Sequence, residues 1–305
     1  MIVSASRRTD LPAYYADWLC RRFSEGCVLV RNPFRFHQVS RIALTAETVD
    51  GIVFWTKNPL PLTRRLSVFR DFPYYFQWTL TPYGRDIEPG LPDKSRLLAA
   101  FRDLAEAIGP ERLVWRYDPV LLSPAWTCAR HEETFARFCR ALRGASDTCV
   151  VSFLDGYRHG EAFCRTHAVR PPDASERETL LASFAESARA CGFTLRACCE
   201  AETGLPPAAC IDAARLSRIG GVRIAAGKDR SQRPGCACAE AVDIGAYNTC
   251  PAGCGYCYAV RAPRSVRLSP QDAPLLGAPL TAEDTVTDRA MPRRARPASL
   301  FLFPE

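Results

Sequence analysis

Three cysteines near the end of the chain, Cys250, Cys254 and Cys257, form a CxxxCxxC motif directly after an apolar run. Three thiolates on one short loop can hold three irons of a [4Fe-4S] cluster and leave the fourth iron open to another ligand. Gly253 and Gly255 lie within the motif, and glycine accepts the unusual backbone angles that wrapping a cluster requires. The motif therefore predicts a reactive iron–sulfur cluster.

A second set of cysteines lies earlier in the chain and could form a separate metal site. Two thiolates in a CxC pair, together with two from other segments, could enclose an auxiliary iron–sulfur cluster or a zinc ion with no open position. The four candidate ligands are Cys198, Cys210, Cys236 and Cys238. The alternative is that these cysteines are simply small buried residues.

Zinc is also the alternative metal for the C-terminal motif. A structural zinc ion usually has four ligands, so the three cysteines would need a fourth, which Cys236 or Cys238 could supply. The formal net charge of +7 suits an anionic partner, although no run of Lys or Arg is long enough to resemble a nucleic-acid-binding arm. The alternative function is therefore a zinc-stabilised nucleic-acid-binding protein.

Composition and the N-terminal residues indicate the compartment. The chain contains 15 cysteines, and residues 1–10 lack the charged-then-apolar layout of a signal peptide. A reducing compartment argues against a disulfide framework. No apolar run is long enough for a membrane helix. We therefore expect a cytoplasmic protein with no membrane partner, in which some cysteines bind metal.

Short β-branched and aromatic runs alternate with amphipathic stretches, which is typical of parallel β/α units. The predicted strands are residues 2–6, 51–57, 74–81, 112–118, 149–154, 193–198 and 241–247, with 222–225 as a further candidate. The predicted helices are residues 93–108, 132–142 and 175–191, the last with an N-terminal cap at Ser175 and an end at Gly192.

Two stretches interrupt this alternation. Residues 27–44 contain two apolar runs around an Asn-Pro pair and predict a hairpin insertion. From residue 262 onward the sequence is rich in proline and arginine and predicts a loosely packed tail. We therefore expect one domain over residues 1–261, followed by a tail over residues 262–305.

Several predicted strands end in polar or charged residues. In a parallel β/α barrel the active site lies at the carboxyl ends of the strands, so these side chains could reach a common ligand. The candidate cofactor-binding residues are Ser4, Ser6, Arg7, Lys57, Arg116 and Asp118. Arg116 and Asp118 could instead form a plain ion pair.

The CxxxCx(aromatic)C motif after a strand, with Tyr256 as the aromatic residue, resembles the cluster motif of the radical S-adenosylmethionine (SAM) superfamily. From SASRRTD through WTKNP, FQWTLTPYG and VWRYDPVLL to the terminal cysteines, the chain also resembles a radical-SAM-like family of domains of unknown function, DUF1848. The resemblance implies a TIM-like β/α barrel, complete or partial, with Cys250, Cys254 and Cys257 as cluster ligands.

The same resemblance implies the activity and the partners. SAM would bind the open iron, and an electron from the cluster would cleave it to a 5′-deoxyadenosyl radical that abstracts a hydrogen from the substrate. The partner would be a small electron-donor protein. The substrate could be a small molecule, a peptide or a nucleic acid, because pocket shape sets this choice.

The position of the motif departs from the superfamily, which places it after the first strand. The ends of a closed barrel can be joined and the ring opened elsewhere without changing the neighbours of any strand. We therefore expect a circular permutation in which residues 241–247 act as the first strand and residues 2–6 lie beside it. Ser4, Ser6 and Arg7 would then lie next to the cluster, where Arg7 could bind the carboxylate of SAM.

Overall fold

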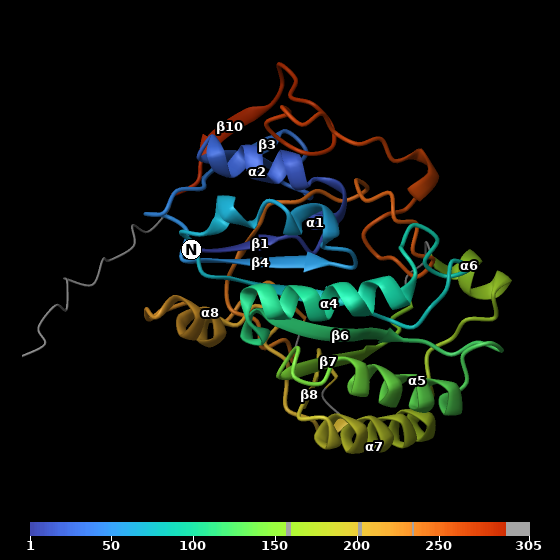
Figure 1. Cartoon of the computed structure of the whole chain (residues 1–305). Helices are drawn as coiled ribbons and strands as arrows, with labels where there is room; N and C mark the ends of the chain where they lie inside the picture. The colour runs from blue at the N-terminus through green and yellow to red at the C-terminus, as the bar shows by residue number, and fades with distance from the viewer. Residues whose placement is uncertain (157–159, 201–202, 234, 291–305) are drawn as a thin grey trace, which may run out of the picture.

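A sheet of seven parallel strands, in the order β8-β7-β6-β5-β4-β1-β9, forms the centre of the protein (Figure 1). The computed structural model describes residues 1–156, 160–200, 203–233 and 235–290. The strands are β1 (Ile2–Ala5), β4 (Gly51–Thr56), β5 (Tyr74–Thr79), β6 (Leu113–Val120), β7 (Thr148–Phe153), β8 (Thr194–Ala197) and β9 (Val242–Asp243). The predicted α/β class is confirmed. The predicted barrel is not seen in closed form, because no pairing joins β8 to β9 within the described residues.

Helices cover this sheet and connect its strands. Those found in the described residues are α1 (Leu11–Tyr14), α2 (Ala16–Ser24), α3 (Leu60–Thr63), α4 (Lys94–Ile108), α5 (Cys128–Ala141), α6 (Glu161–Thr166), α7 (Ala174–Ala190) and α8 (Ala213–Gly220). Helix α7 begins with a capping box between Asp173 and Glu176, so the cap predicted at Ser175 is wrong by two residues. Gly192, with a φ of +83°, follows its end as expected.

The two faces of the sheet bury different sets of side chains, because successive residues of a strand point to opposite faces. Phe54, Phe76 and Trp115 belong to a large core that also contains Phe101 of α4 and Phe135 of α5. Figure 1 shows α4, α5 and α7 along the sheet. The alternate strand residues Val53, Tyr75 and Val114 share a second core with Cys210, Leu216, Cys236 and Cys238. One face therefore carries long helices, and the other carries the cysteine-bearing segments.

The predicted hairpin insertion is confirmed, and it has a third strand. Strands β2 (Cys27–Arg31) and β3 (Gln38–Ala43) pair antiparallel, and β10 (Thr285–Asp288) pairs with β3 in parallel. Leu275 and Leu276 are also buried. Residues 262–290, which belong to the expected tail, thus contribute one exposed strand and two buried leucines, while most of their side chains are exposed. Residues 291–305 lie outside the described residues.

The N-terminal strand lies next to the strand that precedes the cysteine motif. Strands β1 and β9 pair in parallel, with Val3 opposite Val242 and Ser4 opposite Asp243. This confirms the predicted neighbours, although β9 is shorter than the expected 241–247 and residues 222–225 form no strand. Within the described ranges, no helix combines the length and the apolar character needed to cross a membrane.

Candidate functional site

One cavity of about 450 Å³ lies at the carboxyl ends of the strands and is lined by both groups of cysteines. Parallel strands present their carboxyl ends at the same edge, so side chains far apart in sequence meet there. The polar lining includes Ser6, Arg7, Thr9, Asp10, Lys57, Arg116, Asp118, Ser152 and Asp243. The cysteine lining consists of Cys198, Cys199, Cys210, Cys236, Cys238, Cys250, Cys254 and Cys257. Of the predicted site residues, Ser4 alone does not line this cavity.

The loop with the CxxxCxxC motif, residues 250–257, is held against residues 87–90. The backbone N–H of Gly90 donates to the Ala252 carbonyl at 3.0 Å, and the N–H of Gly255 donates to the Ile87 carbonyl at 2.9 Å. Cys254 is buried, and Cys250 and Cys257 are partly exposed to the cavity. The loop therefore presents its three cysteines from a backbone that is hydrogen-bonded in place.

Burial also sets the ionisation of two of these thiols. It raises the pKa of Cys250 to about 12, and it raises the pKa of Cys254 well above its usual range. Metal ions bind the thiolate and displace the proton, so metal loading would be coupled to proton release at this loop.

A buried cluster of charges packs behind the aromatic residue of the motif. Lys57 Nζ donates to Glu88 Oε1 at 2.8 Å and lies 2.7 Å from the hydroxyl of Tyr256, which itself donates to Glu88. Burial alone would raise the pKa of Glu88, but the ammonium groups of Lys57 and Lys94 outweigh it and lower the pKa to about 2. Sequence reasoning missed Glu88, because a single glutamate in a loop carries no periodic signal.

Asp243, in β9, is hydrogen-bonded to β1 and to the residues that follow β1. Its carboxylate accepts hydrogen bonds from Ser4 Oγ at 2.9 Å, from the backbone N–H of Arg7 at 2.8 Å, and from Ser6 Oγ. The backbone N–H of Gly245 donates to the same carboxylate at 3.0 Å. The two serines predicted to contact a cofactor are thus bonded to Asp243. The sequence signal for this missed residue was a lone carboxylate inside an apolar run.

Two polar groups that line the cavity have no hydrogen-bond partner among the described residues. They are the hydroxyl of Thr9, which is 5% exposed, and the indole N–H of Trp55. The side chain of Arg7 lies close to the same ring, with its guanidinium carbon 5.9 Å from the Trp55 ring centroid, and it faces Asp229 at 3.7 Å. Buried polar groups without partners are rare in folded proteins, so these two indicate a place for polar groups of a ligand.

Arg116 contacts the second group of cysteines through Cys210. The guanidinium donates to Cys210 Sγ at 2.8 Å and to Asp118 Oδ2 at 3.0 Å, so the ion pair considered from the sequence is present. Cys210 Sγ lies 3.5 Å from Cys198 Sγ. The hydrogen bond from Cys210 lowers the pKa of Cys238 to about 6. The structure thus brings together the four cysteines that the sequence grouped as an auxiliary site.

The cysteine side chains of the described residues do not converge on one metal-binding position. In the described residues, no three or more His, Cys, Asp or Glu side chains are arranged so that they could hold one metal ion. The ligands of a four-iron cluster bind separate irons at separate corners, so they do not need to converge on one point. The donor set at residues 250–257, three cysteines facing one cavity, fits such a cluster in number and in chemistry.

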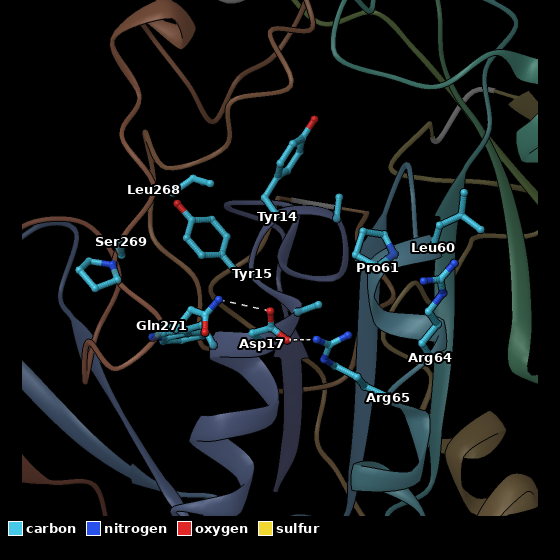
Figure 2. A pocket seen from close by; sticks show the side chains of 14 residues that line it. Tyr14, Tyr15, Asp17, Leu60, Pro61, Arg64, Arg65, Leu268, Ser269 and Gln271 are labelled. Atoms are coloured by element: carbon cyan, nitrogen blue, oxygen red, sulfur yellow. Dashed lines mark hydrogen bonds and ion pairs between the residues drawn. The ribbon is translucent and has the colours of Figure 1, made fainter.

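A second pocket, of about 550 Å³, lies between α1, α3 and residues 268–271 (Figure 2). In Figure 2, Arg65 and Gln271 both reach Asp17, and no cysteine lines this pocket. Tyr15, which lines it, donates from its hydroxyl to the Thr249 carbonyl at 2.8 Å, next to the cysteine loop. We assign the candidate site to the first cavity, because unpartnered polar groups and thiols gather there.

Comparison with known proteins supplies a family and no activity. The model of a family described only as a domain of unknown function (DUF1848) matches residues 2–259, which include all three cysteines of the motif. No curated protein and no solved structure matches the chain.

Proposed function

The chain belongs to the DUF1848 family, and from the cavity at its strand ends we propose that it is a radical SAM enzyme. The observation that carries the proposal is the position of Cys250, Cys254 and Cys257 on one loop after a parallel strand, facing a cavity lined by polar strand ends. When bound there, a [4Fe-4S] cluster would supply the electron that cleaves SAM to methionine and a 5′-deoxyadenosyl radical.

The proposed strand order is that of a circularly permuted radical SAM barrel. Strand β9 takes the place of the first strand, because it leads into the cysteine loop, and β1 takes the place of the second. The parallel pairing of β1 with β9 and of β1 with β4 supports this order. The carboxylate of Asp243 bonds β1 to β9 at the end of β9, from which the chain continues to the cysteine loop.

The residues beside the loop would bind and orient SAM. Thr9 and Trp55 supply one hydroxyl and one indole N–H that have no partner in the part of the chain that the structure describes. The guanidinium of Arg7 lies at the same cavity, where it can form a charge-assisted hydrogen bond with a carboxylate. Together these groups would fix the position of the cofactor, and position decides which substrate hydrogen a radical reaches.

Lys57 would place a positive charge beside the cysteine loop. Its ammonium group is held by Glu88 and by the hydroxyl of Tyr256, and it adds a positive charge behind Cys254. Tyr256 itself lines the cavity, so its ring would exclude water from one side of the cysteine loop. The proposed partner is a small electron-donor protein, and the proposed substrate is a molecule small enough, or a residue exposed enough, to enter a cavity of about 450 Å³.

Anaerobic reconstitution with iron and sulfide, followed by incubation with SAM and dithionite, tests the proposal. We expect brown protein that releases 5′-deoxyadenosine and methionine. Cys254→Ala should lose the iron and the product, while Cys128→Ala, outside the cavity at the start of α5, should keep both. Circular dichroism checks that both variants are folded. Colourless protein that binds zinc in place of iron, or full iron loading of folded Cys254→Ala, would overturn the proposal.

A further inference from the structure

We propose that Cys198, Cys210, Cys236 and Cys238 form a second metal centre, ligated by thiolates, in the cavity that the CxxxCxxC loop also lines. All four line the same cavity as Cys250, Cys254 and Cys257. This centre goes beyond the proposed function and does not depend on it, because it uses a different set of ligands.

Two of the four sulfur atoms are already in contact with each other. Cys210 Sγ lies 3.5 Å from Cys198 Sγ, and Cys236 and Cys238 line the same cavity. Zinc–sulfur bonds of about 2.3 Å in a tetrahedral site place neighbouring sulfurs about 3.8 Å apart. The spacing of Cys198 and Cys210 is close to that value. Among the described residues no three of these thiols converge on one point, so metal binding would require Cys236 and Cys238 to turn toward this pair.

Three separate segments deliver these cysteines, which argues against chance clustering along one loop. Cys198 follows β8, Cys210 precedes α8, and Cys236 and Cys238 lie on the segment that returns to β9. The segments are bonded to one another and to the sheet. The N–H of Ala239 donates to the Ile211 carbonyl at 2.9 Å. The side chains of Tyr75 and Gln77 both donate to the Cys210 carbonyl.

Two of the sulfur atoms accept hydrogen bonds from nitrogen donors, which stabilise thiolates. Arg116 donates to Cys210 Sγ at 2.8 Å, and the backbone N–H of Ile211 donates to Cys238 Sγ at 3.4 Å. Arg116 is 4% exposed and is held in place by Asp118 and by Gln77. A fixed buried cation offsets the negative charge that four thiolates would bring to the site. Arg116 is therefore a positioning residue for this centre.

The chemistry of the ligand set selects thiophilic metals. Four thiolates suit a zinc ion or an iron–sulfur cluster with all its irons covered. Both come from the same binding chemistry: each thiol loses its proton, and the sulfur forms a bond to the metal. Binding of Zn²⁺, or of a cluster that is already assembled, changes no oxidation state and so requires no oxidant or reductant. The five cysteines of the region, including Cys199, form no disulfide, so their thiols are available as ligands.

The test uses the full chain with Cys250, Cys254 and Cys257 all replaced by Ala, so that only the second centre can bind. This triple variant, which is the parent of the single substitutions below, is purified anaerobically. It is then loaded with Zn²⁺ alone, with Co²⁺ alone, or with iron and sulfide. We expect stoichiometric zinc or one iron–sulfur cluster per chain, and intense visible bands with Co²⁺ that report tetrahedral thiolate ligation. Comparing the loading with zinc and the loading with iron and sulfide shows whether the centre holds a zinc ion or an iron–sulfur cluster.

Single substitutions in this parent assign the ligands. Cys210→Ala should abolish stoichiometric binding, and Cys128→Ala should leave it unchanged. Arg116→Met should weaken zinc binding by about 10-fold to 100-fold and shift the Co²⁺ bands. The Co²⁺ spectrum of the parent itself needs no further substitution, so a Cys210 variant that fails to fold does not remove the test. Absence of bound metal in the folded parent, a disulfide between Cys198 and Cys210 in its place, or unchanged binding by folded Cys210→Ala would overturn the proposal.

Discussion

Ser4 Oγ donates a 2.9 Å hydrogen bond to Asp243 Oδ2, and this bond joins the first strand of the chain to the strand that leads into the cysteine loop. The two residues are also register partners in the sheet. A buried carboxylate that accepts several donors fixes the strands relative to one another, because each donor would otherwise lose its partner. The position of the loop therefore depends on a contact between opposite ends of the sequence.

Replacing Asp243 by Ala should strongly destabilise the protein. The hydroxyls of Ser4 and Ser6 and the N–H of Arg7 would lose their acceptor, and each unsatisfied buried group costs about 1 to 3 kcal/mol. We expect the free energy of unfolding, measured with urea, to fall by at least about 3 kcal/mol. Asp103→Ala, at an exposed position of α4, should change it by less than about 0.5 kcal/mol. Equal effects of the two substitutions would contradict this role of Asp243.

Thr9→Val separates stability from ligand binding. Valine has the shape of threonine, and the hydroxyl that it removes is buried without a partner, so the free protein should be as stable as before or slightly more stable. If SAM binds at this cavity, its affinity should fall by about fivefold to tenfold, as for one lost hydrogen bond. Thermal unfolding and equilibrium binding of SAM to reconstituted protein measure the two effects. An unchanged dissociation constant would show that the hydroxyl does not contact SAM.

Gly90→Ala should disturb the cysteine loop. A Cβ at this position would lie 2.6 Å from the Ala252 carbonyl oxygen, and backbone cannot rotate away as a side chain can. We expect a loss of about 1 to 3 kcal/mol in the free energy of unfolding and lower iron loading on reconstitution. Gly156→Ala is the matched control, because an added Cβ there meets nothing within 4 Å. Normal iron loading and stability in Gly90→Ala would mean that the loop tolerates displacement.

His131 should make stability depend on pH below neutrality. Its Nδ1 lies 2.8 Å from the Tyr117 hydroxyl and its Nε2 lies 2.8 Å from the Leu121 carbonyl, so Nε2 carries the hydrogen and Nδ1 accepts. Burial lowers the pKa of His131 from 6.5 to about 4, and Arg130 acts in the same direction. The unfolded chain therefore takes up a proton below about pH 6.5, whereas the folded chain resists until about pH 4.

Stability should accordingly fall as the pH decreases from about 6.5 to about 4, by up to about 3 kcal/mol from this one residue. Urea unfolding at a series of pH values measures the slope. His131→Phe should be less stable at pH 7, because two hydrogen bonds are lost, but its stability should vary less between these pH values. His167→Gln, at an exposed position, should keep the slope of the unsubstituted protein. Identical slopes for all three proteins would exclude His131 as the cause.

The sequence by itself determined the local elements and the motif. Short runs of β-branched and aromatic residues predicted the strands, because parallel strands covered on both faces have nearly continuous apolar sequences. The same reasoning predicted the hairpin formed by β2 and β3. The spacing of Cys250, Cys254 and Cys257 predicted a compact set of thiols, because a short loop keeps its residues together in any fold.

Only the tertiary structure decided what meets at the cavity. The contacts of Asp243 with Ser4, and of Lys57 with Glu88, join residues far apart in the chain, and no local pattern encodes such a pairing. The absence of a pairing between β8 and β9 in the described residues, and the pairing of β10 with β3, likewise depend on long-range packing. Arg116 reaches Cys210 because alternate strand residues share one face of the sheet and the 210 segment covers that face. The sequence could place each side chain on a strand or a loop, but the packing of distant segments against the sheet determined its partner.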